Sequence, residues 1–344
     1  MKIAVISTTI IKCFPPGYAG LEAISWYCAK GLAELGHQVT LVAPNDSECP
    51  GCEVIHTGPA GQHDEHSAFQ IVWKRLFEFD CIVDHSWNKF AYTLKEEGVL
   101  KAPVIGVCHA PLATMYQQLP AIEKPCFVCI SNDQAKVFDV QFDERECRVV
   151  RNGIDTDFYR PLRVPRSDRL LFLARFSSVK SPHLAIEACQ KAGVGIDLIG
   201  DTTLTGEPEY LHRCLSMADG KQIRVLGGVA RGETVWHYSQ AHCMLHPTRD
   251  FREPLGLAPL ESMAAGCPVI AWKRGALKET VVDGETGWLV KSVDQMADVI
   301  KGPARSIPDT MRTRCREWVC DNFSLKHMVD DYERVVQEAV NGGW

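Results

Sequence analysis

Two glutamates and the segment around them have the residue types needed to hold a sugar linked to a diphosphate. Glu253 precedes the expected start of a helix near Leu255–Leu257, and Glu261 lies about two turns further along that helix. A helix that begins after a loop carrying Pro254 and Gly256 offers unpaired N–H groups and the positive end of its dipole to a diphosphate. Ionised carboxylates accept directed hydrogen bonds, which suits sugar hydroxyls. We therefore predict a binding site in this segment.

Two cations stand where a second strand is expected to end. The strand at 170–174 delivers Arg175, and Lys180 follows five residues later at the start of a helix. Ligands of open α/β sheets bind at the carboxyl ends of the strands, so a pair of cations there suits a pyrophosphate. Isolated surface Arg and Lys residues are usually just solvated, but the order and position of these two favour a binding role.

The elements that position these residues alternate between buried strands and helices, the signature of a parallel sheet covered by helices. In the N-terminal half we expect strands at 2–8, 37–43, 80–84, 103–108 and 126–131, and a first helix that ends at about Gly36. The proline-bearing segment 160–168 reads as a linker. After it, a second series begins at 170–174 and continues near 195–199, 222–226, 242–246 and 268–271. The predicted fold class is α/β, with two doubly wound units in succession.

With these elements in place, the segment 253–271 resembles the glutamate-x7-glutamate signature of retaining glycosyltransferases with the GT-B fold, family 4 (group 1). The resemblance covers nearly the whole chain and is sharpest over 171–290. It implies two Rossmann-like domains that face each other across a cleft. The first, acceptor-binding, would span 1–158 with the C-terminal helix 323–344 packed back on it, and the second, nucleotide-sugar-binding, would span 159–322.

The resemblance also implies roles for the carboxylates and cations. The family's first glutamate contacts the donor sugar and its second holds the ribose hydroxyls, which maps these roles onto Glu253 and Glu261. Either glutamate alone would be read as a solvated or helix-start residue, but the complete string argues against that reading. Arg175 and Lys180 match cations that neutralise the leaving diphosphate, and the donor-binding loop would comprise Pro254, Leu255, Gly256 and Leu257.

On the N-terminal side the resemblance points to one histidine and one loop. The family often has a histidine after the strand at 103–108, near the donor sugar on the acceptor side, and His109 takes that role as a positioning or hydrogen-bonding group. A lone histidine at a strand end is otherwise usually structural. His85 is a weaker candidate for contact with the acceptor. Gly20 is retained from the family's glycine pair before the first helix, so the backbone can still approach a phosphate.

Several positions depart from the family pattern. Ala174 and Ser181 replace glycines on either side of the two cations, and Ala19 replaces the first glycine of the pair before the first helix. The segment Arg274-Gly275-Ala276 stands where a glycine pair is common, and the stretch 247–253 is longer than in many members. The last two departures adjoin the donor pocket, so they bear on the identity of the donor more than on the reaction class.

The expected reaction moves a hexose-type sugar from a UDP-, GDP- or ADP-linked donor to an unknown acceptor hydroxyl. No Asp-x-Asp motif stands at a strand end, so we expect no metal ion. We also expect no cofactor, and the resemblance implies a front-face mechanism in which the departing phosphate helps deprotonate the acceptor hydroxyl. A nucleotide-sugar epimerase, a sugar phosphorylase and a non-catalytic nucleotide-sugar binding protein are the alternatives on this architecture. No Gly-x-Gly-x-x-Gly follows a first strand, which disfavours a dinucleotide oxidoreductase.

Composition narrows the class of partner and the compartment. The chain has 344 residues and a formal net charge of -6, so no sequence-wide basic field recruits nucleic acid. No apolar run reaches the ~20 residues of a membrane span, and peripheral membrane contact stays open. Fifteen cysteines, mostly in apolar runs, and the lack of a signal peptide at the N-terminus predict a cytoplasmic protein. Cys49/Cys52 could bind metal or form a labile disulfide, whereas Cys126/Cys129 on one strand would point to opposite faces.

Overall fold

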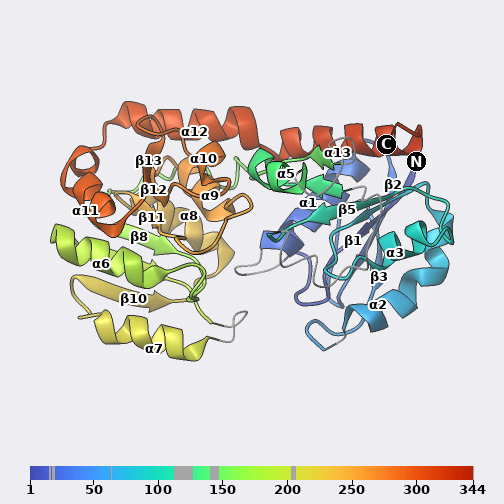
Figure 1. The fold of residues 1–344 in the computed structure, drawn as a ribbon, viewed down its shortest axis with the longest axis horizontal. Helices are drawn as coiled ribbons and strands as arrows, with labels where there is room; N and C mark the ends of the chain where they lie inside the picture. The colour runs from blue at the N-terminus through green and yellow to red at the C-terminus, as the bar shows by residue number, and fades with distance from the viewer. Residues whose placement is uncertain are drawn as a thin grey trace. The chain divides into compact units, whose positions relative to one another are not determined.

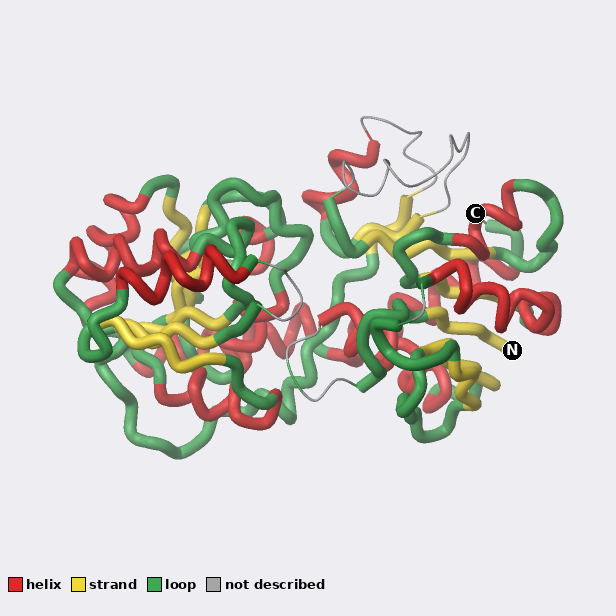
Figure 2. Tube along the Cα trace, turned by 90° about the horizontal axis from the view of Figure 1, so that it is seen from below, coloured by secondary structure: helices red, strands yellow, loops and turns green. Residues whose placement is uncertain are grey.

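The computed structural model describes residues 1–14, 17, 20–62, 64–111, 127–139, 147–202 and 207–343. These residues form two compact units, each built around its own parallel sheet (Figure 1). The first unit contains residues 1–14 and 20–153 together with the C-terminal segment from 325 onward, and the second contains 154–324. In both units the strands lie between helices (Figure 2), which confirms the predicted α/β class.

The sheet of the first unit has seven strands in the order β3-β2-β1-β4-β5-β6-β7, all parallel. The strands are β1 Lys2–Ile6, β2 Gln38–Ala43, β3 Glu53–His56, β4 Cys81–Asp84, β5 Val104–Cys108, β6 Phe127–Cys129 and β7 Cys147–Val149. The strand order reverses between β1 and β4, so the loops after these two strands diverge and leave a crevice typical of ligand sites in such sheets. The described helices are α1 Gly20–Glu34, α2 Glu65–Val72, the 3-10 helix η1 Trp73–Glu78, α3 Phe90–Glu96, α5 Asn132–Asp139 and α13 Leu325–Val340.

The C-terminal helix α13 belongs to the first unit, where it packs against α1. Its buried side chains, among them Met328, Tyr332 and Val336, recur at helical spacing on one face. The two helices approach closely at Gly31, because a Cβ atom there would lie 2.2 Å from Cγ2 of Val329. A chain segment more than three hundred residues from the N-terminus in sequence thus completes the N-terminal core.

The second unit has six parallel strands in the order β10-β9-β8-β11-β12-β13. They are β8 Leu170–Leu173, β9 Ile196–Ile199, β10 Ile223–Gly227, β11 Met244–His246, β12 Val269–Trp272 and β13 Gly287–Val290. The helices are α6 Pro182–Ala192, α7 Pro208–Met217, α8 Arg231–Gln240, α9 Leu257–Ala264, α10 Leu277–Thr280, α11 Val293–Lys301, the 3-10 helix η3 Pro303–Arg305 and α12 Asp309–Phe323. Helix α6 packs against α7 and α11, whereas α9 packs against α8 and α12, so two groups of helices flank the sheet.

The predicted strands are present within one or two residues of their expected bounds, and three observed strands, β3, β7 and β13, are not in the predicted series. β3 is half-exposed and β7 has only three residues, so neither carries the run of buried apolar residues that marks an interior strand. Helix α9 starts at Leu257 and the chain turns at Gly266, where φ is +71°, as the sequence predicts. Within the described ranges, no helix is long and apolar enough to cross a bilayer.

Candidate functional site

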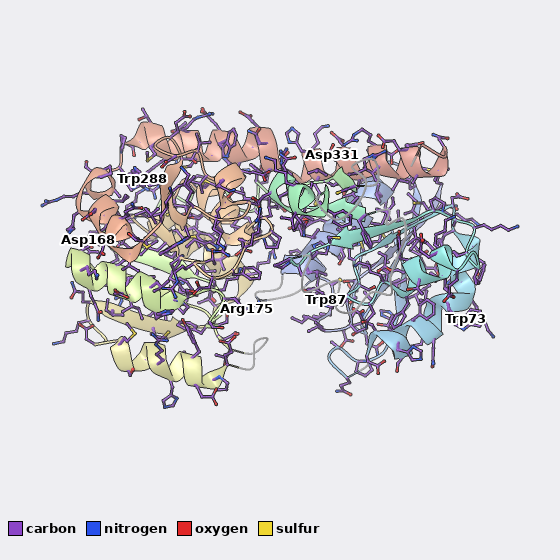
Figure 3. The ribbon with its side chains drawn as sticks, viewed as in Figure 1. Trp73, Trp87, Asp168, Arg175, Trp288 and Asp331 are labelled. Carbon is purple, nitrogen blue, oxygen red and sulfur yellow. The ribbon has the colours of Figure 1, made fainter. Side chains whose placement is uncertain are left out.

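The site in the second unit is built at the point where its strand order reverses. β8 and β11 are neighbours in the sheet, although β9 and β10 lie between them in the sequence. The loop between β8 and α6 contains Arg175, labelled in Figure 3, and Lys180. The loop after β11 leads through Glu253 to α9. The topology therefore places the predicted cations and the first glutamate together at the carboxyl ends of two neighbouring central strands.

Lys180 and Glu253 form a buried ion pair. The Nζ atom of Lys180 donates to Oε2 of Glu253 at 2.6 Å, and the two side chains are only 9% and 8% exposed. The ammonium group also lies 5.4 Å from the centre of the Phe251 ring, within the range of a cation–π contact. The sequence predicted both charged residues at this site, and the structure shows that they neutralise each other there.

His246 is the third member of this cluster, and the sequence analysis did not identify it. It is the last residue of β11, is almost fully buried, and its Nε2 atom lies 3.3 Å from the same Oε2 atom of Glu253. Because a carboxylate only accepts, Nε2 carries the proton and donates. The available signal is a histidine in the final position of an apolar strand, which is also common in a buried core and does not by itself indicate a site.

The charges in this cluster are fixed near neutral pH. Burial by itself would raise the pKa of Glu253, but the charge of Lys180 and the hydrogen bond from His246 outweigh it and lower the pKa to about 2. Burial lowers the pKa of His246, and the nearby carboxylate only partly opposes this effect. The cluster therefore consists of an ammonium, a carboxylate and a neutral imidazole. Both of these hydrogen bonds to the carboxylate are accepted by Oε2.

Four buried polar atoms beside this cluster have no hydrogen-bond partner among the described residues. They are Nε of Arg175 and Oγ of Ser177, in the loop after β8, and Nδ1 of His246 and Oγ1 of Thr248, at the end of β11. Buried polar groups in folded proteins are nearly always paired, because an unmade hydrogen bond costs about 1–3 kcal/mol. Donors and acceptors left together at the carboxyl edge of a parallel sheet indicate a polar ligand.

Helix α9 begins at Leu257, close after Glu253, and its N-cap residue Gly256 has φ +89° and provides no side-chain cap. The N–H groups of its first turn thus have no side-chain acceptor at the N-cap, and a diphosphate can accept from them. Pro254 and Leu255 are buried between the glutamate and the helix, while Leu257 is partly exposed. These four residues are the loop that the sequence predicted to bind the donor, and that role remains a prediction.

Glu261, within α9, belongs to a different side-chain cluster. The hydroxyl of Tyr238 donates to its Oε2 atom at 3.0 Å. Burial and the Glu261 carboxylate together raise the pKa of Tyr159 well above its usual value, and the guanidinium of Arg231 lies 5.8 Å from the centre of the Tyr159 ring. Glu261 is therefore a partly buried, hydrogen-bonded carboxylate rather than a solvated helix residue. Its predicted contact with the ribose stays a prediction.

Gly275 supports the backbone of Glu253 from behind. It has φ +59°, and a Cβ atom at this position would lie 2.5 Å from the carbonyl oxygen and 2.7 Å from the nitrogen of Glu253. The next residue, Ala276, donates its N–H to that same carbonyl at 2.9 Å. The single glycine that remains in Arg274-Gly275-Ala276 is thus the one that a close backbone approach requires.

Replacing Gly275 by Ala is expected to displace Glu253. The strained φ and the clash should lower the free energy of unfolding by about 1–3 kcal/mol and weaken nucleotide binding about tenfold or more. Gly284→Ala is the matched control, because Gly284 also has positive φ, +84°, but no heavy atom lies within 4 Å of its added Cβ. Thermal unfolding and titration calorimetry of both variants measure the effect, and equal nucleotide affinity in the two would contradict the supporting role of Gly275.

In the first unit, the histidines predicted from the sequence are in direct contact with each other. His109 directly follows β5 and is half-buried, whereas His85 directly follows β4 and is only 1% exposed. His85 Nδ1 and His109 Nε2 are 2.8 Å apart. Gly20 is the first residue of α1, and residues 18 and 19, which precede it in the predicted phosphate loop, lie outside the described residues.

The cysteine pairs give no metal site in the part of the chain that the structure describes. Cys49 and Cys52 have their Sγ atoms 3.3 Å apart, and both are free thiols. Cys126 lies outside the described residues, and Cys129 instead contacts Cys147 of the next strand, Sγ to Sγ 3.1 Å. Among described residues, no group of three or more His, Cys, Asp or Glu side chains is placed to hold a metal ion.

Comparison with known proteins gives two family matches that together cover most of the chain. The family described as glycosyl transferases group 1 matches residues 155–309, and the family described as glycosyltransferase family 4 matches residues 18–158. Among curated relatives, D-inositol 3-phosphate glycosyltransferase of Mycolicibacterium paratuberculosis is 28% identical over 252 residues, which is 66% of this chain and 57% of that protein. This chain thus spans little more than half the length of that relative.

Solved structures show the same fold at low sequence identity. Sucrose-phosphate synthase from Thermosynechococcus elongatus superposes with a TM-score of 0.80 at 19% identity, covering 99% of this chain and 100% of the other. AviGT4, a glycosyltransferase of avilamycin A biosynthesis, gives 0.79 at 22%, covering 99% and 98%. HepE of Anabaena, solved in complex with UDP, gives 0.75 at 17%, covering 98% and 100%.

Proposed function

Because the chain belongs to the group 1 glycosyltransferases and has the GT-B fold, we propose that it is a retaining, metal-independent enzyme that transfers a hexose-type sugar from a nucleotide diphosphate sugar to an acceptor hydroxyl. The observation that carries this proposal is the Lys180–Glu253–His246 cluster, with unpaired buried polar atoms around it at the carboxyl ends of β8 and β11. A fold alone does not specify an activity, whereas placed charges and unpaired donors restrict what can bind.

In the proposed reaction the bond between the anomeric carbon and the β-phosphate oxygen breaks as the acceptor oxygen bonds to that carbon. Negative charge then grows on the leaving diphosphate, where Arg175, Lys180 and the first turn of α9 supply positive charge and N–H donors. The departing phosphate oxygen takes the proton of the acceptor hydroxyl, so no protein base is required. Glu253, ionised because its pKa is about 2, accepts from a donor-sugar hydroxyl.

The positions of the charges also fit a diphosphate better than a neutral ligand. Arg175 and Lys180 both lie at the carboxyl end of the sheet. Glu253 neutralises the charge of Lys180, so this ion pair leaves the positive charge of Arg175 to be balanced by an anionic ligand. Relatives of the same fold indicate which ligands to try first, since HepE of Anabaena has been solved with UDP and with UDP-glucose. The acceptor of the proposed reaction stays open, including the inositol phosphate class named for the mycobacterial relatives.

Thermal unfolding with candidate nucleotides tests the donor site directly. We expect UDP, GDP or ADP, in the presence of a metal chelator, to raise the Tm, because a ligand at one hundred times its Kd stabilises the folded state by about 2.7 kcal/mol. The corresponding nucleoside monophosphate is the matched control and should shift the Tm less, since it lacks the phosphate that Lys180 would contact. No shift with any diphosphate or its sugar conjugates would contradict the proposed donor site.

A further inference from the structure

The segment that joins β2 to β3 contains a turn with a cysteine at each end, Cys49 and Cys52. The N–H of Cys52 donates to the carbonyl oxygen of Cys49 at 3.0 Å, and Gly51 has φ +84°. A type II turn needs positive φ at its third residue and favours proline at its second, so the sequence Cys-Pro-Gly-Cys specifies this turn. Such a turn brings its first and last Cα atoms within about 7 Å of each other, which is close to the separation that a disulfide spans.

The two thiols of this turn are in direct contact. Sγ of Cys49 donates to Sγ of Cys52 at 3.3 Å, and both thiols are free. A bond between the sulfurs therefore requires only a small movement of the two side chains. Cys129 and Cys147 are a comparable pair, on the neighbouring strands β6 and β7, with Sγ atoms 3.1 Å apart.

The turn is held against α1 and against the segment that follows β1. The N–H of Cys13 donates to Oγ of Ser47 at 2.9 Å, and Nε1 of Trp26, in α1, donates to the carbonyl oxygen of Glu48 at 2.7 Å. These contacts fix the backbone immediately before the first cysteine of the turn. Two groups held in a reacting position combine far faster than separate molecules, so one sulfur of the turn can rapidly resolve a mixed disulfide on the other.

The two thiols differ in exposure and in acidity. Cys49 is only 5% exposed, whereas Cys52 is half-buried. The hydrogen bond from Cys49 lowers the pKa of Cys52 against the opposing effects of burial and of Glu34, and it raises the pKa of Cys49. Burial raises the pKa of the neighbouring Cys13 to about 11. Because the thiolate is the nucleophile in thiol–disulfide exchange, Cys52 is the thiol that reacts first.

A zinc ion is the other partner that a Cys-x-x-Cys pair suggests. Zinc sites in proteins use at least three protein ligands, and structural sites use four. Across the described ranges, no group of three or more His, Cys, Asp or Glu side chains is placed to hold a metal ion. The geometry of the turn thus favours chemistry between the two sulfurs.

We propose that Cys49 and Cys52 are a redox-active dithiol that exchanges with small-molecule disulfides of the glutathione type. The Cys52 thiolate attacks one sulfur of the reagent, and the other half of the reagent leaves and takes up a proton. Cys49 then loses its proton to solvent and attacks the Cys52 sulfur, which releases the second half of the reagent as a thiol. Two protein thiols are oxidised by two electrons, and the reagent is reduced to two thiols. This site lies in the first unit and does not depend on the proposed sugar transfer.

Peptide mapping during oxidation tests the dithiol in the intact protein. Reduced protein is mixed with excess oxidised glutathione, alkylated at timed intervals and digested for mass spectrometry. We expect Cys49 and Cys52 to escape alkylation together, in a peptide that is lighter by two hydrogen atoms, before Cys129 and Cys147 do. The comparison pair should react more slowly, because hydrogen bonds to its thiol neighbours and burial raise the pKa of Cys129. A dithiol that stays reduced, or a glutathione adduct that persists on Cys52, would overturn the proposal.

Single serine variants test the order of attack. Cys49→Ser lacks the resolving thiol, so glutathione should stay attached to Cys52. Cys52→Ser lacks the attacking thiol, so the buried Cys49 should stay reduced as long as the protein is folded. Modification of Cys49 in folded Cys52→Ser at the rate of the parent protein would refute the assignment of Cys52 as the attacking thiol.

Gly51→Ala tests the turn while it keeps both thiols. Its added Cβ would lie 3.7 Å from Cβ of Ala33, an ordinary contact, so the change acts mainly through the positive φ. We expect release of the second glutathione to slow about fivefold or more, because the sulfurs are no longer held together. Gly36→Ala is the matched control, with φ +92° and no heavy atom within 4 Å of its added Cβ, and should react like the parent. Equal rates in the two variants would contradict the role of the turn.

Discussion

Glycosyl transfer is expected to fall about 10³-fold in kcat/KM when Lys180 is replaced by Met or when Glu253 is replaced by Gln. Lys180→Met removes a positive charge from the place where negative charge develops on the leaving diphosphate. Glu253→Gln keeps the shape of the side chain but weakens its hydrogen bond to a donor-sugar hydroxyl and leaves Lys180 without its counter-charge at 2.6 Å. Steady-state kinetics with the nucleotide sugar identified by thermal unfolding measure both losses.

The double variant shows whether the two residues act as a unit. Groups that cooperate in one step lose nearly all of their effect with the first substitution, so Lys180→Met with Glu253→Gln should be little slower than either single variant. The ion pair Arg169–Asp197 lies in the same unit, between the starts of β8 and β9, and Asp197→Asn is a control for general damage to a partly buried pair. Near-normal turnover in either folded single variant would refute the proposed mechanism.

The fold could be predicted from the sequence because its central strands are buried and rich in apolar residues. β1, β2 and β4 of the first sheet read as continuous apolar runs, as expected when helices cover both faces of a parallel sheet. The edge strands β3 and β7 could not be predicted in the same way, since half-exposed residues give no apolar run. Strands near the edges of the sheet are less buried, so their sequences carry a weaker apolar pattern and are harder to predict.

The residues of the candidate site were more accessible to sequence analysis than their contacts. Arg175, Lys180 and Glu253 could each be singled out from their place at a strand end or helix start. That Lys180 pairs with Glu253, 73 residues away, depends on β8 and β11 being neighbours, which is a property of the strand order. His246 had no such local signal, because one polar residue at the end of an apolar strand is a common core feature.

The buried pair also changes what its single variants should do to stability. From the sequence, replacing Glu253 or Lys180 should abolish turnover without unfolding the protein. The structure shows that each substitution leaves the partner as a buried, unpaired charge, which typically costs about 3–5 kcal/mol. We therefore expect both single variants to unfold at clearly lower denaturant concentration than the parent, and the double variant Lys180→Met/Glu253→Gln to regain most of the loss, because it leaves no charge unpaired.

The same ion pair can be tested by whether the free energy of unfolding falls or rises as the pH is lowered. The pKa of Glu253 is about 2 in the folded protein and 4.5 in its reference state, so the folded form binds this proton less readily. Its contribution, about 3 kcal/mol, is present above pH 4.5 and is lost as the pH falls toward 2. The double variant should not show this acid-induced loss of stability, which urea unfolding between pH 7 and 3 measures.

In Lys180→Met, protonation of Glu253 should have the opposite effect on the free energy of unfolding from the one it has in the parent protein. Without the ammonium, burial raises the pKa of Glu253 instead of being outweighed, so protonation stabilises the folded variant and its deficit shrinks as the pH falls. A deficit that stays constant from pH 7 to 3 would mean that the lost stability comes from packing around the Lys180 side chain and not from an unpaired carboxylate. Because this measurement needs no substrate, it tests the charge state of the cluster independently of the acceptor, the donor and the reaction.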